Sequence, residues 1–205
     1  MGTKIDLKRE LPWYTAKRDS PQIIEVPELQ YLMIDGHGDP NTPAYDAAVS
    51  ALYPLAYTLK FASKKHVGRD YVVMPLEGLW WADDMDTFTS ARDKTRWDWT
   101  LMILTPEWIT ADMFTSAVEE LRGKKAPERL DDVRLEGLSE GQCVQALHVG
   151  AYDDETELLL RMHEEFIPQH GLTMVGKHHE IYLGDPRRVE PSKLRTILRQ
   201  PVSPA

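Results

Sequence analysis

The sequence predicts an α+β fold made of two pseudo-symmetric strand–helix–strand–strand modules, with antiparallel sheets, helices and a ligand cleft between the modules. One observation is that β-rich runs and amphipathic helical stripes follow the same order in two stretches of the chain. Another is that 205 residues, 42% of them hydrophobic, suffice for one domain with a sizeable core. We expect a single domain over residues 1–205, with module one at about 22–110, a connecting helix and linker at 111–141, and module two at 142–203.

Module one is predicted to contain three strands around a long helix. Asn41 or Thr42 can cap the helix, and Pro43 suits its first turn. Apolar residues recur every three or four positions from Tyr45 onward, which indicates a buried stripe, and Pro54 is expected to kink or end this helix. The predicted strands are Gln30–Asp35, Tyr71–Trp81 and Trp97–Thr105.

Module two repeats this order. Asp153 or Asp154 can cap a helix that stops near Pro168 and Gly171. A separate helix is expected between the modules, at Ala111–Arg122, and the polar N-terminal segment is expected to pack over the domain as an extended arm. The predicted strands of module two are Cys143–Gly150, His178–Leu183 and Leu194–Val202, and its helical stripe is Leu158, Leu159, Met162 and Phe166.

Composition narrows the classes of partner. A net charge of −9 argues against nucleic acid, because binding a polyanion requires clustered lysine and arginine. No apolar run approaches the roughly 20 residues that span a membrane, and the first 20 residues do not resemble a signal peptide. The single cysteine, Cys143, rules out an intrachain disulfide framework. We therefore expect a cytoplasmic protein without nucleic-acid or membrane partners, either a monomer or a homodimer.

The run His178–Leu183 carries the first candidate site. Side chains alternate along a strand, so His178, Glu180 and Tyr182 share one face and the residues between them share the other. A carboxylate and a phenol roughly 7 Å apart can orient a ligand carbonyl and a water molecule. An exposed face of ordinary polar residues would give the same pattern, and the sequence leaves that alternative open.

The run Pro75–Trp81 carries the second candidate site. Glu77 lies within an apolar stretch, where burial would raise its pKa and suit it to acid–base work or to pairing with a cation. Gly78 could form a bulge. Regular alternation would place Trp81 on the face of Glu77, whereas a bulge would place Trp80 there.

Tryptophans and histidines supply the candidates for ligand contact. Five indoles fall between residues 80 and 108, and indole walls stack flat aromatic molecules and attract cations. Some of them must also belong to the core. The ligand-contact candidates are Trp80, Trp81, Trp97, Trp99, Trp108, His178 and His37.

Other chemistries lack a motif. His178 and His179 point to opposite faces of a regular strand, and the remaining histidines do not have the spacing of metal ligands. The sequence contains no nucleophile elbow, phosphate-binding loop or dinucleotide fingerprint. We expect neither a metal nor a cofactor.

Together with the doubled element order, three segments resemble the GyrI-like small-molecule-binding family, and more narrowly its stand-alone members without a DNA-binding domain. The segments are "PLEGLWW" at 75–81, "KHHEIYLGDPRR" at 177–188 and "KLRTILRQPV" at 193–202. The resemblance extends from about Pro21 to Val202. It implies two modules paired about a pseudo-twofold axis, with a cleft that takes drug-like, often cationic and aromatic molecules. Glu180 and Tyr182 match the C-terminal motif, and Glu77 and Trp80 match the N-terminal one.

Some stand-alone members of that family open the strained cyclopropane of DNA-alkylating natural products. The resemblance thus implies a detoxifying hydrolase in which Glu180 positions water, Tyr182 donates to a substrate oxygen and Glu77 assists or binds positive charge. The roles of the two glutamates could be exchanged. The alternative is a non-catalytic binder or sensor of aromatic, cationic drugs, because the same pocket would serve both functions. In either case the partner is a hydrophobic aromatic small molecule.

Overall fold

The computed structural model describes residues 4–83 and 93–205. Within them nine antiparallel strands pair in the order β1-β6-β9-β8-β3-β4-β2-β5, with β7 added beside β9. The strands are β1 (Gln22–Val26), β2 (Leu29–His37), β3 (Glu77–Trp81), β4 (Asp98–Leu104), β5 (Arg134–Leu138), β6 (Gly141–Val149), β7 (Leu172–Met174), β8 (His178–Tyr182) and β9 (Arg195–Pro204). The α-helices are α1 (Leu7–Glu10), α2 (Pro43–Ala62), α3 (Ala111–Arg122), α4 (Thr156–Leu160) and α5 (Ile167–Gln169).

The predicted repeat is confirmed. One half follows the order β2-α2-β3-β4 and the other follows β6-α4-β8-β9. In the sheet, β6-β9-β8 lies beside β3-β4-β2, so the two halves meet where β3 pairs with β8. Their register joins Glu77 to Ile181, Gly78 to Glu180 and Trp80 to His178. Because β3 and β8 are equivalent strands of the two halves, this seam lies at the pseudo-twofold axis.

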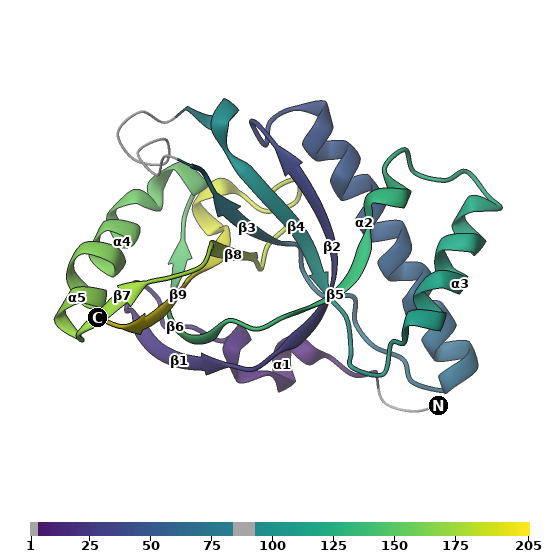
Figure 1. Cartoon of the computed structure of the whole chain (residues 1–205), viewed down its shortest axis with the longest axis horizontal. Coiled ribbons are helices and arrows are strands. Elements are labelled where there is room, and N and C mark those ends of the chain that lie inside the picture. Colours follow the sequence, from purple (N-terminus) through teal and green to yellow (C-terminus); the bar gives the residue numbers. More distant parts are fainter. Residues whose placement is uncertain (1–3, 84–92) are drawn as a thin grey trace.

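One face of the sheet carries the main helices, and we call it the helix face. Tyr45 of α2 contacts Trp80, while His163, in the π-helical turn between α4 and α5, contacts His178. Figure 1 shows α2 and α3 at one end of the sheet and α4 and α5 at the other. Helix α2 packs on β2 and β4, whereas α4 and its continuation form a separate small core with β6 and β9.

The opposite face is covered by the N-terminal segment, and we call it the arm face. The side chain of Tyr14 is buried there and donates a hydrogen bond to Glu77. The carbonyl oxygen of Trp13 accepts a hydrogen bond of 2.7 Å from Arg199 on β9. The segment thus packs on the sheet through named polar contacts, on the side away from α2 and α4.

Several local expectations need correction. Helix α2 does not end at Pro54 but continues to Ala62. The second helix begins after Glu155, and neither Asp153 nor Asp154 caps it through a side chain. Of the predicted strand Tyr71–Trp81, only its last five residues form a strand. Strands β1, β5 and β7 were not predicted, because each is a short piece at or near the edge of the sheet with a partly polar sequence.

Candidate functional site

The helix face carries a continuous polar and aromatic surface at the seam between the halves. The register of β3 and β8 places Gly78 and Trp80 beside Glu180 and His178. Side chains alternate regularly through Gly78, so this glycine forms no bulge and Glu77, Leu79 and Trp81 point to the arm face. The predicted face of His178, Glu180 and Tyr182 therefore exists, and it is completed by Trp80 from the other half.

Three of these residues form a short chain of hydrogen bonds. The indole nitrogen of Trp80 donates to the Tyr182 hydroxyl at 2.9 Å, and this hydroxyl donates to Glu180 Oε2 at 2.7 Å. A Cβ atom at Gly78 would lie 2.8 Å from the Trp80 indole nitrogen and 3.2 Å from the Tyr182 hydroxyl. Glycine at this position is what allows the indole and the phenol to meet.

An aromatic wall stands beside this chain of hydrogen bonds. Tyr45 of α2 stacks on Trp80 with a centroid separation of 6.3 Å and an interplanar angle of 16°. Trp97 meets Trp80 edge-on at 5.8 Å, and Trp99 meets Tyr45 edge-on at 5.3 Å. Trp99 is 1% exposed and belongs to the core, whereas Trp97 and Tyr45 are half-buried. Trp80 is itself 5% exposed, so the part of the wall open to a ligand is Tyr45 and Trp97, which pack against Trp80.

A second carboxyl group, that of Glu155, interacts electrostatically with Glu180. Glu155 immediately precedes α4 and is 5% exposed, and the Glu180 side chain is 18% exposed. Burial, and then the negative charge of Glu180, raise the pKa of Glu155 to about 9. Burial also raises the pKa of Glu180 to about 7, although the hydrogen bond from Tyr182 and the charge of His179 act in the opposite direction. Two such groups can hold one proton between them near neutral pH.

His178 borders the same pair. Its Nε2 lies 3.7 Å from Glu180 Oε1, and its side chain is 11% exposed. Burial, with smaller effects from His163 and His179, lowers the pKa of His178 to about 3. The ring is therefore neutral where the glutamates titrate, and it adds a polar edge to the site without adding charge.

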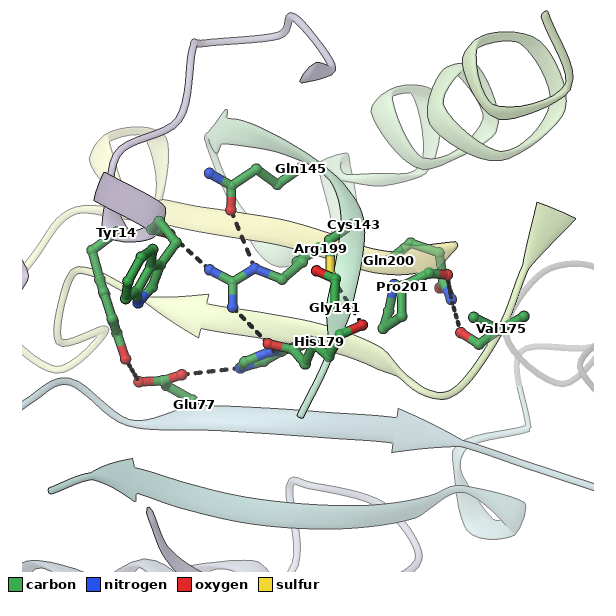
Figure 2. Close-up of polar contacts among 12 residues, drawn as sticks. Tyr14, Glu77, Gly141, Cys143, Gln145, Val175, His179, Arg199, Gln200 and Pro201 are labelled. Carbon is green, nitrogen blue, oxygen red and sulfur yellow. Dashed lines mark hydrogen bonds and ion pairs between the residues drawn. The ribbon is translucent and has the colours of Figure 1, made fainter. Parts of the chain in front are cut away.

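Glu77 does not join this site. It is fully buried on the arm face, where it accepts from Tyr14 and lies 3.0 Å from His179 Nε2 (Figure 2). The expectation that Glu77 assists Glu180 within one site is not supported by this geometry, because the sheet itself separates the two carboxylates. The second carboxyl group on the helix face is Glu155.

Three other predicted ligand contacts lie elsewhere. Trp81 is on the arm face with the Lys177 ammonium 3.2 Å from a ring centroid. Trp108 donates from its indole nitrogen to Ser63 at 3.0 Å, away from the seam. His37 is exposed, and its Nδ1 lies 2.8 Å from Asp98 Oδ1. The structure brings none of them to Glu180.

Two hollows lie away from the Glu155–Glu180 pair. One, of about 320 Å³, lies on α2 and α3 and includes Tyr57 and Phe61. The other, also about 320 Å³, lies on the arm face and includes Leu79, Glu140 and Lys177.

Across 4–83 and 93–205 there is no group of three or more histidine, cysteine or acidic side chains placed to hold a metal ion. In these ranges no helix has the length and apolar character needed to cross a membrane.

Sequence reasoning missed Tyr45, Tyr152 and Glu155. Tyr152 meets Tyr182 edge-on at 5.7 Å. The available signal for Glu155 was its place in the acidic run 153–155 just before a helix. The sequence does not show which of these three acids is buried; in the structure it is Glu155 alone. Tyr45 was identified as the start of a buried stripe but not as part of the aromatic wall.

Comparison with known proteins gives a consistent picture. The family model of the GyrI-like small molecule binding domain matches residues 19–203. Three crystal structures from Listeria innocua cover 98% of this chain and 100% of their own. They are an uncharacterized conserved protein (38% identity, TM-score 0.89), a hydrolase (38%, 0.85) and a hydrolase encoded by lin2189 (39%, 0.87).

A more distant structure shares the fold alone. The C-terminal domain of EcmrR is 9% identical with a TM-score of 0.56, over 91% of this chain and 98% of that one. No curated protein matches the chain.

Proposed function

Because the chain belongs to the GyrI-like small-molecule-binding family, we propose that its helix face binds a flat, hydrophobic aromatic compound and hydrolyses it. The substrate class we propose is a strained cyclopropane conjugated to a carbonyl group, as in genotoxic alkylating natural products. The observation that carries this proposal is the pair Glu155 and Glu180. The negative charge of Glu180 acts on Glu155, and both carboxyl groups have raised pKa values.

The two carboxyl groups suit opposite roles. With the higher pKa, Glu155 keeps its proton and serves as the general acid. Glu180 has a pKa of about 7, so near neutral pH it is ionised in a large fraction of molecules and serves as the general base. In many enzymes, two side chains of the same type act as acid and base because their surroundings give them different pKa values.

The reaction balances with one water molecule. Glu180 takes a proton from water as the water oxygen bonds to a cyclopropane carbon. The adjacent ring bond breaks, and its electron pair moves through the conjugated system to the carbonyl oxygen. Glu155 protonates that oxygen, and proton exchange between the carboxyl groups restores the starting state. The product is the substrate plus one water.

Tyr182 orients the base in this proposal. Its hydroxyl donates to Glu180 and accepts from the Trp80 indole, so one carboxylate oxygen is fixed and Oε1 stays available for water. Donation to the substrate oxygen, which the sequence suggested for Tyr182, is better suited to the protonated Glu155. The open part of the wall, Tyr45 and Trp97, would stack the substrate.

The two Listeria innocua hydrolases support an enzymatic reading. They are 38% and 39% identical to this chain, and the match covers their full length. Likeness at this level makes a shared reaction class a reasonable proposal, and the carboxyl pair provides chemistry for it.

The test is incubation of the protein, well below one equivalent, with a cyclopropane-bearing alkylator, followed by mass spectrometry. We expect a gain of one water. Glu180→Gln and Glu155→Gln should each lower kcat by about 100-fold or more, the usual contribution of a general acid or base. Glu157→Gln is the matched control, because Glu157 is two residues after Glu155 and exposed. This variant should retain the wild-type rate.

Two results would contradict the proposal. Tryptophan quenching by the alkylator without any product would identify a non-catalytic binder, which the aromatic wall would equally serve. Full turnover by both glutamine variants would show that any hydrolysis occurs elsewhere on the protein.

A further inference from the structure

Figure 2 shows a buried polar network around His179, the residue that precedes Glu180 in β8, on the arm face of the sheet. At its centre, His179 Nε2 lies 3.0 Å from Glu77 Oε2, and Nδ1 lies 2.9 Å from Glu140 Oε1. The side chains of His179 and Glu77 are 0% exposed, and that of Glu140 is 3% exposed. When both carboxylates are ionised they only accept hydrogen bonds, so both ring nitrogens of His179 then carry hydrogen and the ring is an imidazolium cation.

The rest of the network balances that charge. Arg199 Nη1 donates to Glu140 Oε2 at 2.8 Å, and its other nitrogens donate to the Trp13 carbonyl and the Gln145 side chain. Two carboxylates thus face two cations, and Tyr14 donates to Glu77. Although burial alone would lower it, the pKa of His179 is raised by Glu140 and Glu77. Buried charges are stable only when they are paired in this way.

The cation is one residue from the proposed base. His179 and Glu180 are consecutive in β8, so their side chains point to opposite faces of the same strand. The intervening material is a strand of backbone, which screens charge much less than water does. An imidazolium at this position favours the ionised form of the neighbouring carboxyl group.

We propose that His179 is a positioning residue for Glu180: its buried imidazolium, held by Glu77 and Glu140, supplies the positive charge that keeps the base ionised beside Glu155. This inference rests on the proposed role of Glu180. It assigns a function to a network that makes no contact with the helix face.

Titratable side chains from several elements surround Glu180. Glu155, before α4, opposes its ionisation, as do the phenols of Tyr45 and Tyr152 if they ionise. On its own strand, Tyr182 donates a hydrogen bond and His178 is neutral. Among the described residues, His179 is therefore the cation that acts on Glu180. Arg199 is paired with Glu140.

The experiment measures the titration of Glu180 directly. Carbon-13 NMR of protein labelled at the glutamate carboxyl carbons gives each midpoint, and Glu180→Gln identifies the Glu180 signal. We expect His179→Gln, which keeps a side chain able to hydrogen-bond Glu140 or Glu77, to raise the Glu180 midpoint on the order of one pH unit. The acidic limb of the activity profile should move upward by the same amount.

Tyr14→Phe is the matched control. It removes a hydrogen bond from the same network but changes no charge, so the Glu180 midpoint should stay at its wild-type value. A midpoint unchanged in His179→Gln, or shifted equally in Tyr14→Phe, would overturn the proposal.

A second measurement needs no variant. Nitrogen-15 NMR of the wild-type histidine rings should show both nitrogens of His179 protonated throughout the range in which Glu180 titrates. A neutral His179 ring at pH 7 would overturn the proposal, even if the glutamine variant fails to fold. Because both NMR experiments proceed without substrate, a protein that binds but does not hydrolyse would still test the electrostatic inference.

Discussion

At the scale of single residues, surroundings rather than identity separate the acidic side chains of this protein. Glu140 is buried, yet His179 and Arg199 oppose the effect of burial and lower its pKa to about 2. Glu155 is buried beside another carboxyl group, and its pKa rises to about 9. Strand alternation could predict the face of Glu180. It could not identify Glu155, because the partner of Glu180 is 25 positions earlier and reaches it only through the packing of α4 on the sheet.

The raised pKa of Glu155 has a cost in stability that depends on pH. In the unfolded chain Glu155 releases its proton near its ordinary value of 4.5, whereas in the folded chain it does so near 9. The folded state therefore binds more protons between these values, and its stability falls as pH rises. We predict that Glu155→Gln exceeds wild type in unfolding free energy by at least about 1 kcal/mol at pH 8, and by much less at pH 5.

Urea unfolding at pH 5, 6.5 and 8 would check this prediction, with Glu157→Gln as the control. Groups such as His179 titrate in both proteins, so their contributions cancel in the difference. Stability curves for the variant and the wild type that run parallel across this range would contradict it.

At the scale of elements, segments with strong periodicity were predictable. Helix α3 has the predicted bounds, Ala111–Arg122, because an apolar stripe is followed at once by Gly123. Strand β8 was predicted to within one residue. Strand β5 lies in what was expected to be a charged linker, since its pairing with β2 depends on partners far away in the sequence. The length of β3 is likewise set by its pairing with β4 and β8, and not by the longer apolar run that contains it.

Gly36 illustrates such a distant requirement. In the sequence it is one of several turn glycines, but in β2 it pairs with Trp99, and a Cβ there would lie 1.9 Å from the indole ring. We predict that Gly36→Ala destabilises the protein by about 1–3 kcal/mol, the usual cost of overpacking a core. Gly123→Ala, whose Cβ would have ordinary contacts of 3.6 Å, should be tolerated. Thermal unfolding of both variants would check this, and equal melting temperatures would contradict it.

At the scale of the whole molecule, the two halves contribute different things to one site. Glu155, Glu180 and Tyr182 come from the second half, whereas the aromatic wall comes from the first. The doubled element order could be read from the sequence. The seam could not, because nothing local indicates that β3 and β8 pair. For the same reason, the sequence could not indicate that Glu77 and Glu180 point to opposite faces of the sheet.

The wall should therefore affect binding more than chemistry. We predict that Trp97→Ala raises KM for the proposed substrate class by about 10-fold, consistent with the loss of one aromatic contact, with little change in kcat. Trp81→Ala is the matched control, because this indole is on the arm face and should leave KM unchanged. Steady-state kinetics would check both variants, and a fall in kcat alone for Trp97→Ala would contradict the assignment.

The central seam also has a consequence for how such proteins diversify. If the proposed site is correct, substitutions in residues 22–110 would change which molecules are recognised, and substitutions in residues 142–203 would change what happens to them. Under the proposed mechanism, loss of a single glutamate would turn a catalyst into a receptor that retains its ligand intact. A duplicated architecture with this division of labour lets selection act on recognition and on turnover separately, and the passage between an enzyme and a sensor requires very few mutations.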